Sequence, residues 1–243
     1  MDNKFSIEYT VGLHDSGPGG IIKIPTLFNY LQSAAASHTQ SLNFGGTDVQ
    51  QKGYTWVISR YRLSIVKLPK FLDKFIITTW RAGESGKFSI RDSIISDESF
   101  NGLIRATSSW LLINFIKGIS VMPTELYSDY PLNPERAIDD TFSSIPETLH
   151  PNYSKEFVVR KYDLDMNTHV NNTIYAALII ETGEDMNEGK KLKDISLNFK
   201  GEARYGDTII SEAMNDNENK RIIHRLKSKN TGKEITRAIT EWE

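Results

Sequence analysis

The chain has 243 residues, 39% of them hydrophobic, and its 29 basic and 31 acidic side chains give a net charge of −2. This length allows one large domain or two small ones with a substantial core. The balanced charge argues against nucleic acid as a partner, and the absence of cysteine excludes disulfides, zinc–thiolate sites and a cysteine nucleophile. Because no apolar run could span a bilayer and the first residues lack a secretory signal pattern, we expect a cytoplasmic protein without a membrane partner.

The first half of the chain predicts one strand, one helix and then four strands. The first strand is expected at residues 4–13, and a helix opens near Pro25, since proline suits a first helical turn. Segments rich in β-branched and aromatic residues predict the four strands at residues 54–66, 74–82, 87–96 and 103–115. A proline-containing, mostly polar stretch at residues 126–150 is predicted to be a linker.

The second half repeats this order. A strand is expected at residues 154–161, a polar loop follows at 163–172, and a helix is predicted from residue 172 to about residue 186. Four further strands are predicted at residues 193–204, 207–215, 220–229 and 234–242.

Two internal repeats support a duplicated architecture. The frame Arg105-Ala106-x-x-x-Trp110 returns as Arg237-Ala238-x-x-x-Trp242, 132 residues later, and a second pair of segments beginning at Leu63 and Leu197 is offset by 134 residues. Near-equal offsets in the same order indicate two similar halves. A helix followed by an antiparallel sheet that wraps it, present twice, predicts an α+β double hotdog. Its expected parts are a first hotdog at residues 1–125, the linker at 126–150 and a second hotdog at 151–243.

The most informative motif is the loop before the second helix, where Asp165, Asn167 and His169 alternate along the chain. Side chains of period two can point to one side and converge. The following helix start offers N–H groups and the positive end of a dipole to a developing oxyanion. Imidazole titrates near neutral pH, so His169 is the candidate proton-transfer group. The alternative interpretation is a polar turn that only caps the helix.

With these elements in place, the chain resembles the acyl-acyl-carrier-protein thioesterases of plant plastids and bacteria over nearly its whole length. The resemblance rests on the string Asp-x-Asn-x-His-Val-Asn-Asn beginning at Asp165, and on Arg91-Asp92 and the strand leading to Glu202. It implies hydrolysis of the thioester between a fatty acyl chain and acyl carrier protein, without cofactor or metal. The implied catalytic residues are Asp165, Asn167, His169 and Glu202. The implied substrate-binding residues are Trp56, Ile58, Ser108, Asn171 and Tyr175, the first three beside an acyl-chain cavity in the first hotdog.

One departure from the plant members bears on the mechanism. They often have a cysteine directly after the glutamate, whereas this chain has Ala203. Two mechanisms therefore remain: activation of water, or direct attack by a carboxylate. Asp165 could either orient His169 or act on water itself. Strict alternation would put Glu202 on the solvent side of its strand, unless a bulge at Gly201 redirects it.

Several alternatives stay open at this point. The chain could be a non-catalytic hotdog that binds acyl thioesters, an acyl-CoA thioesterase or a hotdog dehydratase, and it could form a homodimer. Because carrier proteins are acidic, we expect basic residues near the site, with Lys193, Lys200 and Arg204 as candidates.

Overall fold

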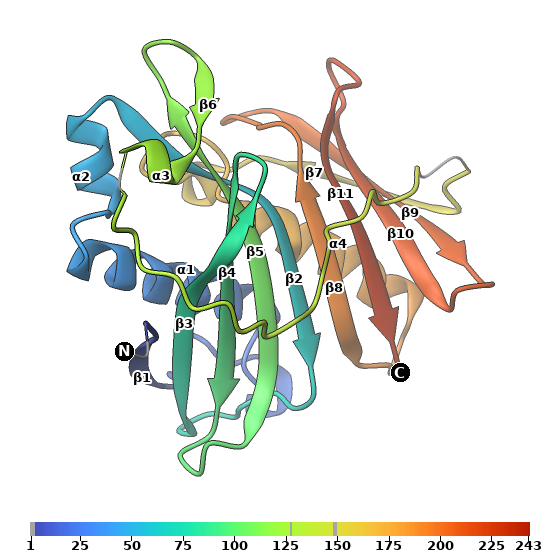
Figure 1. Cartoon of the computed structure of the whole chain (residues 1–243). Helices are drawn as coiled ribbons and strands as arrows, with labels where there is room; N and C mark the ends of the chain where they lie inside the picture. Colours follow the sequence, from blue (N-terminus) through green and yellow to red (C-terminus); the bar gives the residue numbers. More distant parts are fainter. Residues whose placement is uncertain (1–2, 127, 148–149) are drawn as a thin grey trace. The chain divides into compact units, whose positions relative to one another are not determined.

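The computed structural model describes residues 3–126, 128–147 and 150–243 (Figure 1). It divides into two compact units, residues 1–141 and 142–243. None of the described helices is both long and apolar enough to cross a membrane.

The first unit consists of one long helix and an antiparallel sheet. Its sheet order is β1-β3-β4-β5-β2, and β6 pairs with β5. The strands are β1 (Phe5–Thr10), β2 (Tyr54–Ile65), β3 (Lys74–Ser85), β4 (Phe88–Ser96), β5 (Gly102–Asn114) and β6 (Ile119–Val121). The helices are the short 3-10 helix η1 (Pro18–Gly20), α1 (Ile24–Ser41), α2 (Gly46–Gln51) and α3 (Pro123–Leu126).

The second unit repeats this topology. The chain again forms one strand, a long helix and then four strands, and the sheet order β7-β9-β10-β11-β8 matches that of the first unit strand for strand. Its elements are β7 (Tyr153–Val158), the 3-10 helix η2 (Lys161–Asp163), α4 (Asn172–Met186), β8 (Leu192–Phe199), β9 (Thr208–Asp216), β10 (Arg221–Ser228) and β11 (Glu234–Trp242). Both units therefore have the hotdog arrangement, and the predicted double hotdog is confirmed.

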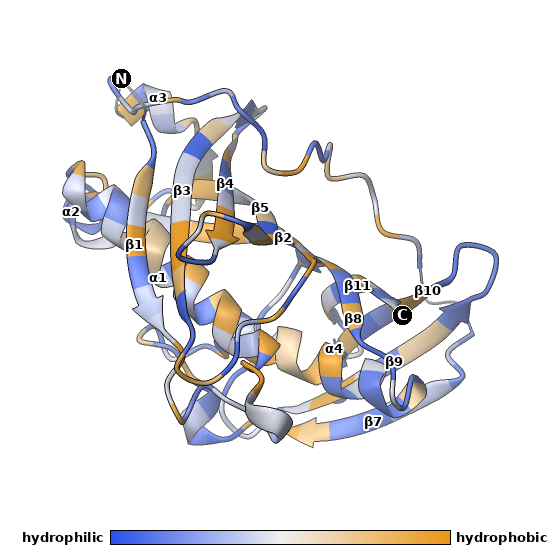
Figure 2. Cartoon of the chain, turned by 90° about the horizontal axis from the view of Figure 1, so that it is seen from below, coloured by the Kyte–Doolittle hydropathy of each residue, from blue (hydrophilic) through white to orange (hydrophobic). Residues whose placement is uncertain are grey.

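The long helix of each unit packs buried side chains against its own sheet, and Figure 2 shows hydrophobic residues in orange along α1 and α4. In the first unit, the ring of Phe28 on α1 contacts that of Tyr61 on β2 edge-on, with centroids 5.2 Å apart. In the second, α4 approaches β11 so closely that a Cβ at Gly183 would lie 2.5 Å from the Trp242 ring. The repeated Arg-Ala-x-x-x-Trp frame also makes the same contact twice: the indole N–H of Trp110 or Trp242 donates to a hydroxyl two residues earlier. The two halves are thus alike in side-chain contacts as well as topology.

The predicted elements agree with the observed ones except where an element is short or irregular. The strand expected at residues 193–204 ends at Phe199 as β8, because the backbone leaves regular pairing there. Three short elements were not predicted: α2, β6 and α3, which have only six, three and four residues. Such segments are too short for hydrophobic periodicity to indicate them.

Part of the segment predicted as a linker packs on the first unit. Residues 128–141, here called the strap, run across β3, β4 and β5 (Figure 1). The indole N–H of Trp80 donates to the carbonyl of Glu135 at 2.8 Å, and the N–H of Asn133 donates to the carbonyl of Arg81 at 3.0 Å. The strap is therefore held by hydrogen bonds to the sheet, although it contains no helix or strand of its own.

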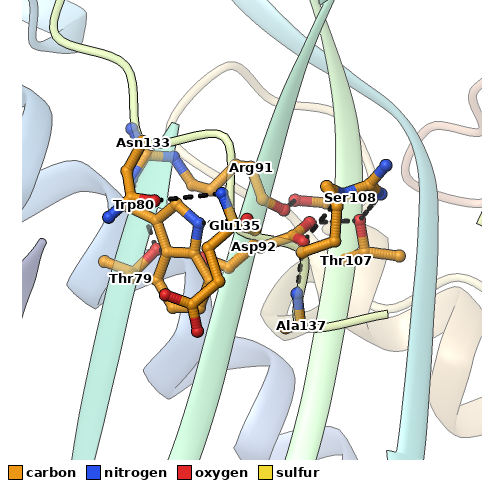
Figure 3. A network of polar contacts seen from close by, with 10 residues as sticks. Thr79, Trp80, Arg91, Asp92, Thr107, Ser108, Asn133, Glu135 and Ala137 are labelled. Atoms are coloured by element: carbon orange, nitrogen blue, oxygen red, sulfur yellow. Dashed lines mark hydrogen bonds and ion pairs between the residues drawn. The ribbon is translucent and has the colours of Figure 1, made fainter. Parts of the chain in front are cut away.

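A buried carboxylate also attaches the strap to the sheet (Figure 3). Asp92 on β4 is fully buried and accepts hydrogen bonds from Arg136 Nε at 2.9 Å and from the backbone N–H of Ala137 at 2.7 Å. The hydroxyl of Thr107 on β5 donates to its other oxygen. Because a buried charge is stable only when paired and hydrogen-bonded, this network joins the strap to the centre of the sheet.

Two buried histidines make stability depend on pH. Burial, assisted by the charge of Arg91, lowers the pKa of His38 from 6.5 to about 4, and burial lowers the pKa of His224 to about 3. The Nδ1 atom of His38 lies 3.0 Å from the Arg91 guanidinium and accepts from it, which also requires a neutral ring. Below pH 6.5 the unfolded chain therefore binds protons that the folded protein does not.

We predict that these two histidines do not change the free energy of unfolding above about pH 6.5. As the pH falls from about 6.5 towards 5, they should lower it. Each histidine contributes up to about 1.4 kcal/mol per pH unit. Urea unfolding between pH 5 and 7.5 measures this, in a range above the titration of most carboxyl groups. His38→Gln should show a shallower decrease, and an unchanged slope in that variant would remove His38 as a cause.

Candidate active site

The loop before α4 is a tight turn and not an extended segment. Leu164 and Val170 form an antiparallel bridge, and the N–H of Asp165 donates to the carbonyl of His169 at 2.7 Å. The N–H of Thr168 in turn donates to the carbonyl of Asp165, and Thr168 has a φ of 65°, in the left-handed region. The period-two alternation expected for Asp165, Asn167 and His169 therefore does not describe this backbone.

Asp165 holds the turn together. Its Oδ1 atom accepts the backbone N–H of Asn167 at 2.8 Å and that of His169 at 3.2 Å. This is the local side-chain-to-backbone bonding typical of aspartate in turns. The sequence left two roles open for Asp165, orienting His169 or acting on water itself. These hydrogen bonds favour the orienting role, which Asp165 exerts through the backbone of the turn.

The carboxylate beside the imidazole is Glu202. Its Oε2 atom lies 3.3 Å from Nδ1 of His169, and the two side chains are 56% and 32% exposed. Among the described residues, no other carboxylate oxygen lies within 4 Å of a nitrogen of this ring. The structure thus brings together two of the four predicted catalytic side chains, from segments far apart in the sequence.

A bulge after β8 directs Glu202 towards His169. The N–H groups of Lys200 and Gly201 both donate to the carbonyl of Ile235, at 2.8 and 3.0 Å, so two residues oppose one on β11. A Cβ on Gly201 would lie 3.1 Å from the carbonyl oxygen of Glu234, which explains the need for glycine. The bulge that the sequence suggested is therefore present and moves Glu202 out of simple alternation.

Ala203 connects the segment that carries Glu202 to both the loop and α4. Its N–H donates to the hydroxyl of Tyr175 at 2.8 Å, and its carbonyl accepts the N–H of Val170 at 3.0 Å. Tyr175 is almost completely buried, and burial raises the pKa of its hydroxyl to about 12. The structure therefore gives Tyr175, expected as a substrate contact, the position of a structural support.

Asn171 caps the helix that follows the loop. Its Oδ1 atom accepts the N–H of Thr173 at 3.0 Å and the Thr173 hydroxyl at 3.1 Å, while its backbone carbonyl accepts the N–H of Ile174. The N–H groups of Thr173 and Ile174 are therefore already occupied within the helix start. Asn167, by contrast, is exposed and no hydrogen bond of its carboxamide to a described residue is present.

The remaining predicted substrate residues all belong to the first unit. Ile58 is buried on β2, and Trp56 donates its indole N–H to the carbonyl of Phe44 at 3.2 Å. The buried hydroxyl of Ser108 donates to the carbonyl of Arg91 at 3.2 Å and accepts from Trp110 at 2.9 Å. Their contacts are those of core residues, and their role towards an acyl chain stays a prediction.

Sequence reasoning missed one residue that shapes the loop. Asp163 is buried and accepts both the backbone N–H and the guanidinium of Arg160, which lowers its pKa in spite of burial. Its backbone carbonyl accepts the N–H of Asn171, which closes the loop at its base. In the sequence, this pair could have been found from the spacing of Arg160 and Asp163, a basic and an acidic residue three positions apart. In the described part of the chain, no three His, Asp or Glu side chains gather as a metal site.

Comparison with known proteins gives the same assignment along the whole chain. The family model of the acyl-ACP thioesterase N-terminal domain matches residues 2–130, and that of the C-terminal domain matches residues 147–243. Oleoyl-acyl carrier protein thioesterase 2 of Arabidopsis thaliana is 27% identical over 286 residues, covering 100% of this chain and 78% of that protein. A palmitoyl-acyl carrier protein thioesterase of Gossypium hirsutum is 26% identical and covers 98% of this chain and 63% of that protein.

Solved structures share the fold. An acyl-ACP thioesterase from Bacteroides thetaiotaomicron superposes with a TM-score of 0.88 at 21% identity, and covers 100% of this chain and 98% of its own. The 12:0-ACP thioesterase from Umbellularia californica gives a TM-score of 0.86 at 22% identity with the same coverage. Since the two family models together account for nearly all of its residues, the chain belongs to the acyl-ACP thioesterase family.

Proposed function

We propose that the second unit of this thioesterase performs the chemistry, with His169 as general base and Glu202 as its partner. The chain hydrolyses the thioester of fatty acyl-acyl carrier protein, in keeping with its family. The observation that carries our assignment of roles is the 3.3 Å approach of Glu202 to His169, beside the start of α4. An imidazole nitrogen can accept a proton from water, and a carboxylate beside the ring can stabilise the positive charge that results.

In the proposed reaction, water is the nucleophile. With Nδ1 of His169 protonated towards Glu202, Nε2 is the base that removes a proton from water as the oxygen attacks the thioester carbonyl. Glu202 stabilises the resulting imidazolium. The tetrahedral intermediate then expels the pantetheine sulfur, which takes the proton from the imidazolium, and the products are a free fatty acid and a free thiol.

The other polar residues support this step. Asp165 fixes the turn through two backbone N–H groups, so it determines where the His169 ring lies. The dipole of α4 favours negative charge on the carbonyl oxygen. The carboxamide of Asn167, which is exposed, is suited to orient either the water or the carbonyl. No thiol can act in place of water, because the chain has no cysteine.

The test is release of thiol from acyl carrier proteins loaded with a series of fatty acyl chains of different lengths. A thiol-reactive dye is well suited because the enzyme contributes no thiol of its own. We expect thiol and free fatty acid in equal amounts. Binding of the acyl carrier protein without release would support the non-catalytic alternative. Faster release from the matching acyl-CoA would identify an acyl-CoA thioesterase instead.

Two expectations from the sequence stay predictions. The first is a cytoplasmic location, which fractionation of cells would test. A homodimer would be tested by the mass of the protein in solution.

A further inference from the structure

The surface beside the catalytic loop combines exposed aromatic, sulfur-containing and basic side chains. Tyr162 is 99% exposed, Met166 91% and Tyr205 59%, and the Arg204 side chain is 70% exposed. The ammonium group of Lys161 lies 5.5 Å from the centroid of the Tyr205 ring. We call Lys161, Tyr162, Met166, Arg204 and Tyr205 the loop rim.

The two segments of the loop rim are held side by side by backbone hydrogen bonds. The N–H of Gly206 donates to the carbonyl of Val159 at 3.1 Å, and the N–H of Val159 donates to the carbonyl of Asp207 at 2.9 Å. Arg204 approaches Glu202 to 3.8 Å, so the rim begins directly beside the proposed catalytic pair. The rim is therefore a continuous part of the second unit that borders the site.

The loop rim has two exposed basic groups, Lys161 and Arg204. Most carboxylates of these segments have local partners: Asp163 binds Arg160, Asp165 binds the turn, and Asp207 accepts the N–H of Arg204 at 2.8 Å. The exposed carboxylate is Glu202, which lies beside His169 and Arg204. Lys161 has no carboxylate within ion-pair distance among residues that the structure describes.

All three basic residues expected to bind the carrier have a carboxylate within ion-pair distance. The ammonium group of Lys193 lies 2.6 Å from Glu243, and that of Lys200 lies 2.7 Å from Glu234. The pair of Arg204 with Glu202 is longer, at 3.8 Å, and the Arg204 side chain is more exposed than either lysine, so the expectation is retained for Arg204 and the structure adds Lys161.

We propose that the loop rim is the docking surface for the acyl carrier protein. This inference rests on the proposed function, because a thioester on the pantetheine arm of a protein can reach His169 only when that protein docks within the length of the arm, and the loop rim borders the site. Tyrosine, methionine and arginine are the residue types enriched in protein interfaces, and exposed positive charge complements an acidic partner. A few such residues supply most of the affinity of an interface.

Kinetics with two substrates that carry the same acyl chain test this inference. We expect Lys161→Glu and Tyr162→Ser each to raise KM for the acyl carrier protein thioester by about tenfold, as loss of an interface contact does. Hydrolysis of the corresponding acyl-pantetheine, which lacks the protein, should change less than about twofold. Neither residue contacts the proposed catalytic side chains.

Matched substitutions of exposed residues elsewhere serve as controls. Lys233→Glu changes an exposed lysine on the turn between β10 and β11, and Phe100→Ser removes an aromatic side chain that is 76% exposed in the first unit. Both should keep the wild-type KM for the carrier substrate. Affinity for the carrier protein without an acyl chain, measured by titration of a fluorescently labelled carrier, should weaken only in the loop-rim variants.

The outcomes separate this inference from the proposed function. If the wild-type enzyme releases thiol from acyl carrier protein but Lys161→Glu and Tyr162→Ser keep its KM and affinity, the docking surface is elsewhere. Equal losses with acyl-pantetheine would also overturn the inference, because they would show damage to the site itself. If the wild type hydrolyses neither substrate, it is the proposed function that fails.

Discussion

Replacement of His169 by alanine is expected to lower kcat for acyl carrier protein thioesters by about 10²- to 10⁴-fold, the usual cost of losing a general base. The imidazole is the group whose free nitrogen can accept the proton of water, and Glu202 alone does not replace it. Folding should be retained, because the ring is 32% exposed and its one ion-pair contact is with a half-exposed carboxylate. Single-turnover release of thiol, together with urea unfolding, measures both quantities.

Two further variants show whether a loss of activity in His169→Ala is caused by the loss of this imidazole. His14→Ala removes an exposed histidine of the first unit and should leave kcat unchanged. Glu202→Gln keeps the shape of the side chain but removes its charge, so it should lower kcat by less than His169→Ala. A His169→Ala enzyme that kept most of its activity would exclude His169 from the mechanism and leave a carboxylate as the activating group.

The largest expected effect on stability comes from Asp92. Asp92→Ala should lower the free energy of unfolding by about 3 kcal/mol, because it leaves the N–H of Ala137 and the guanidinium of Arg136 without their acceptor. The value lies at the low end of the range for broken buried pairs, since the Arg136 side chain is 28% exposed and can regain water. Urea unfolding at pH 7 is the measurement.

Glu135→Ala is the matched control for the strap. Glu135 forms an ion pair with Lys4 at 2.6 Å, but its side chain is 56% exposed. Exposed ion pairs contribute little, so the loss should be below about 1 kcal/mol. The hydrogen bond from Trp80 to the Glu135 carbonyl is kept, because it involves the backbone. Equal losses for Asp92→Ala and Glu135→Ala would show that the buried carboxylate does not hold the strap.

Features that depend on residues close together in the chain could be predicted from the sequence, whereas features that depend on distant segments could not. The start of α1 beside Pro25 and the strands of both sheets follow from local preferences, so they could be predicted. The orientation of Glu202 could be suggested only, because it depends on the carbonyl of Ile235 on another strand. Which of its two roles Asp165 performs stayed open in the sequence, because the hydrogen bonds from the N–H groups of Asn167 and His169 to its oxygen form only in the folded turn.

The sequence by itself determined the order of elements, the duplication into two hotdog units, the polar groups of the loop before α4 and the absence of a thiol nucleophile. These features depend on residues close together in the chain or on composition. Only the tertiary structure decided that Glu202 faces His169, that Asp92 holds the strap and that Lys193 and Lys200 are neutralised. Each of these depends on hydrogen bonds or ion pairs between segments distant in sequence, and such pairings become defined only when the sheets have formed.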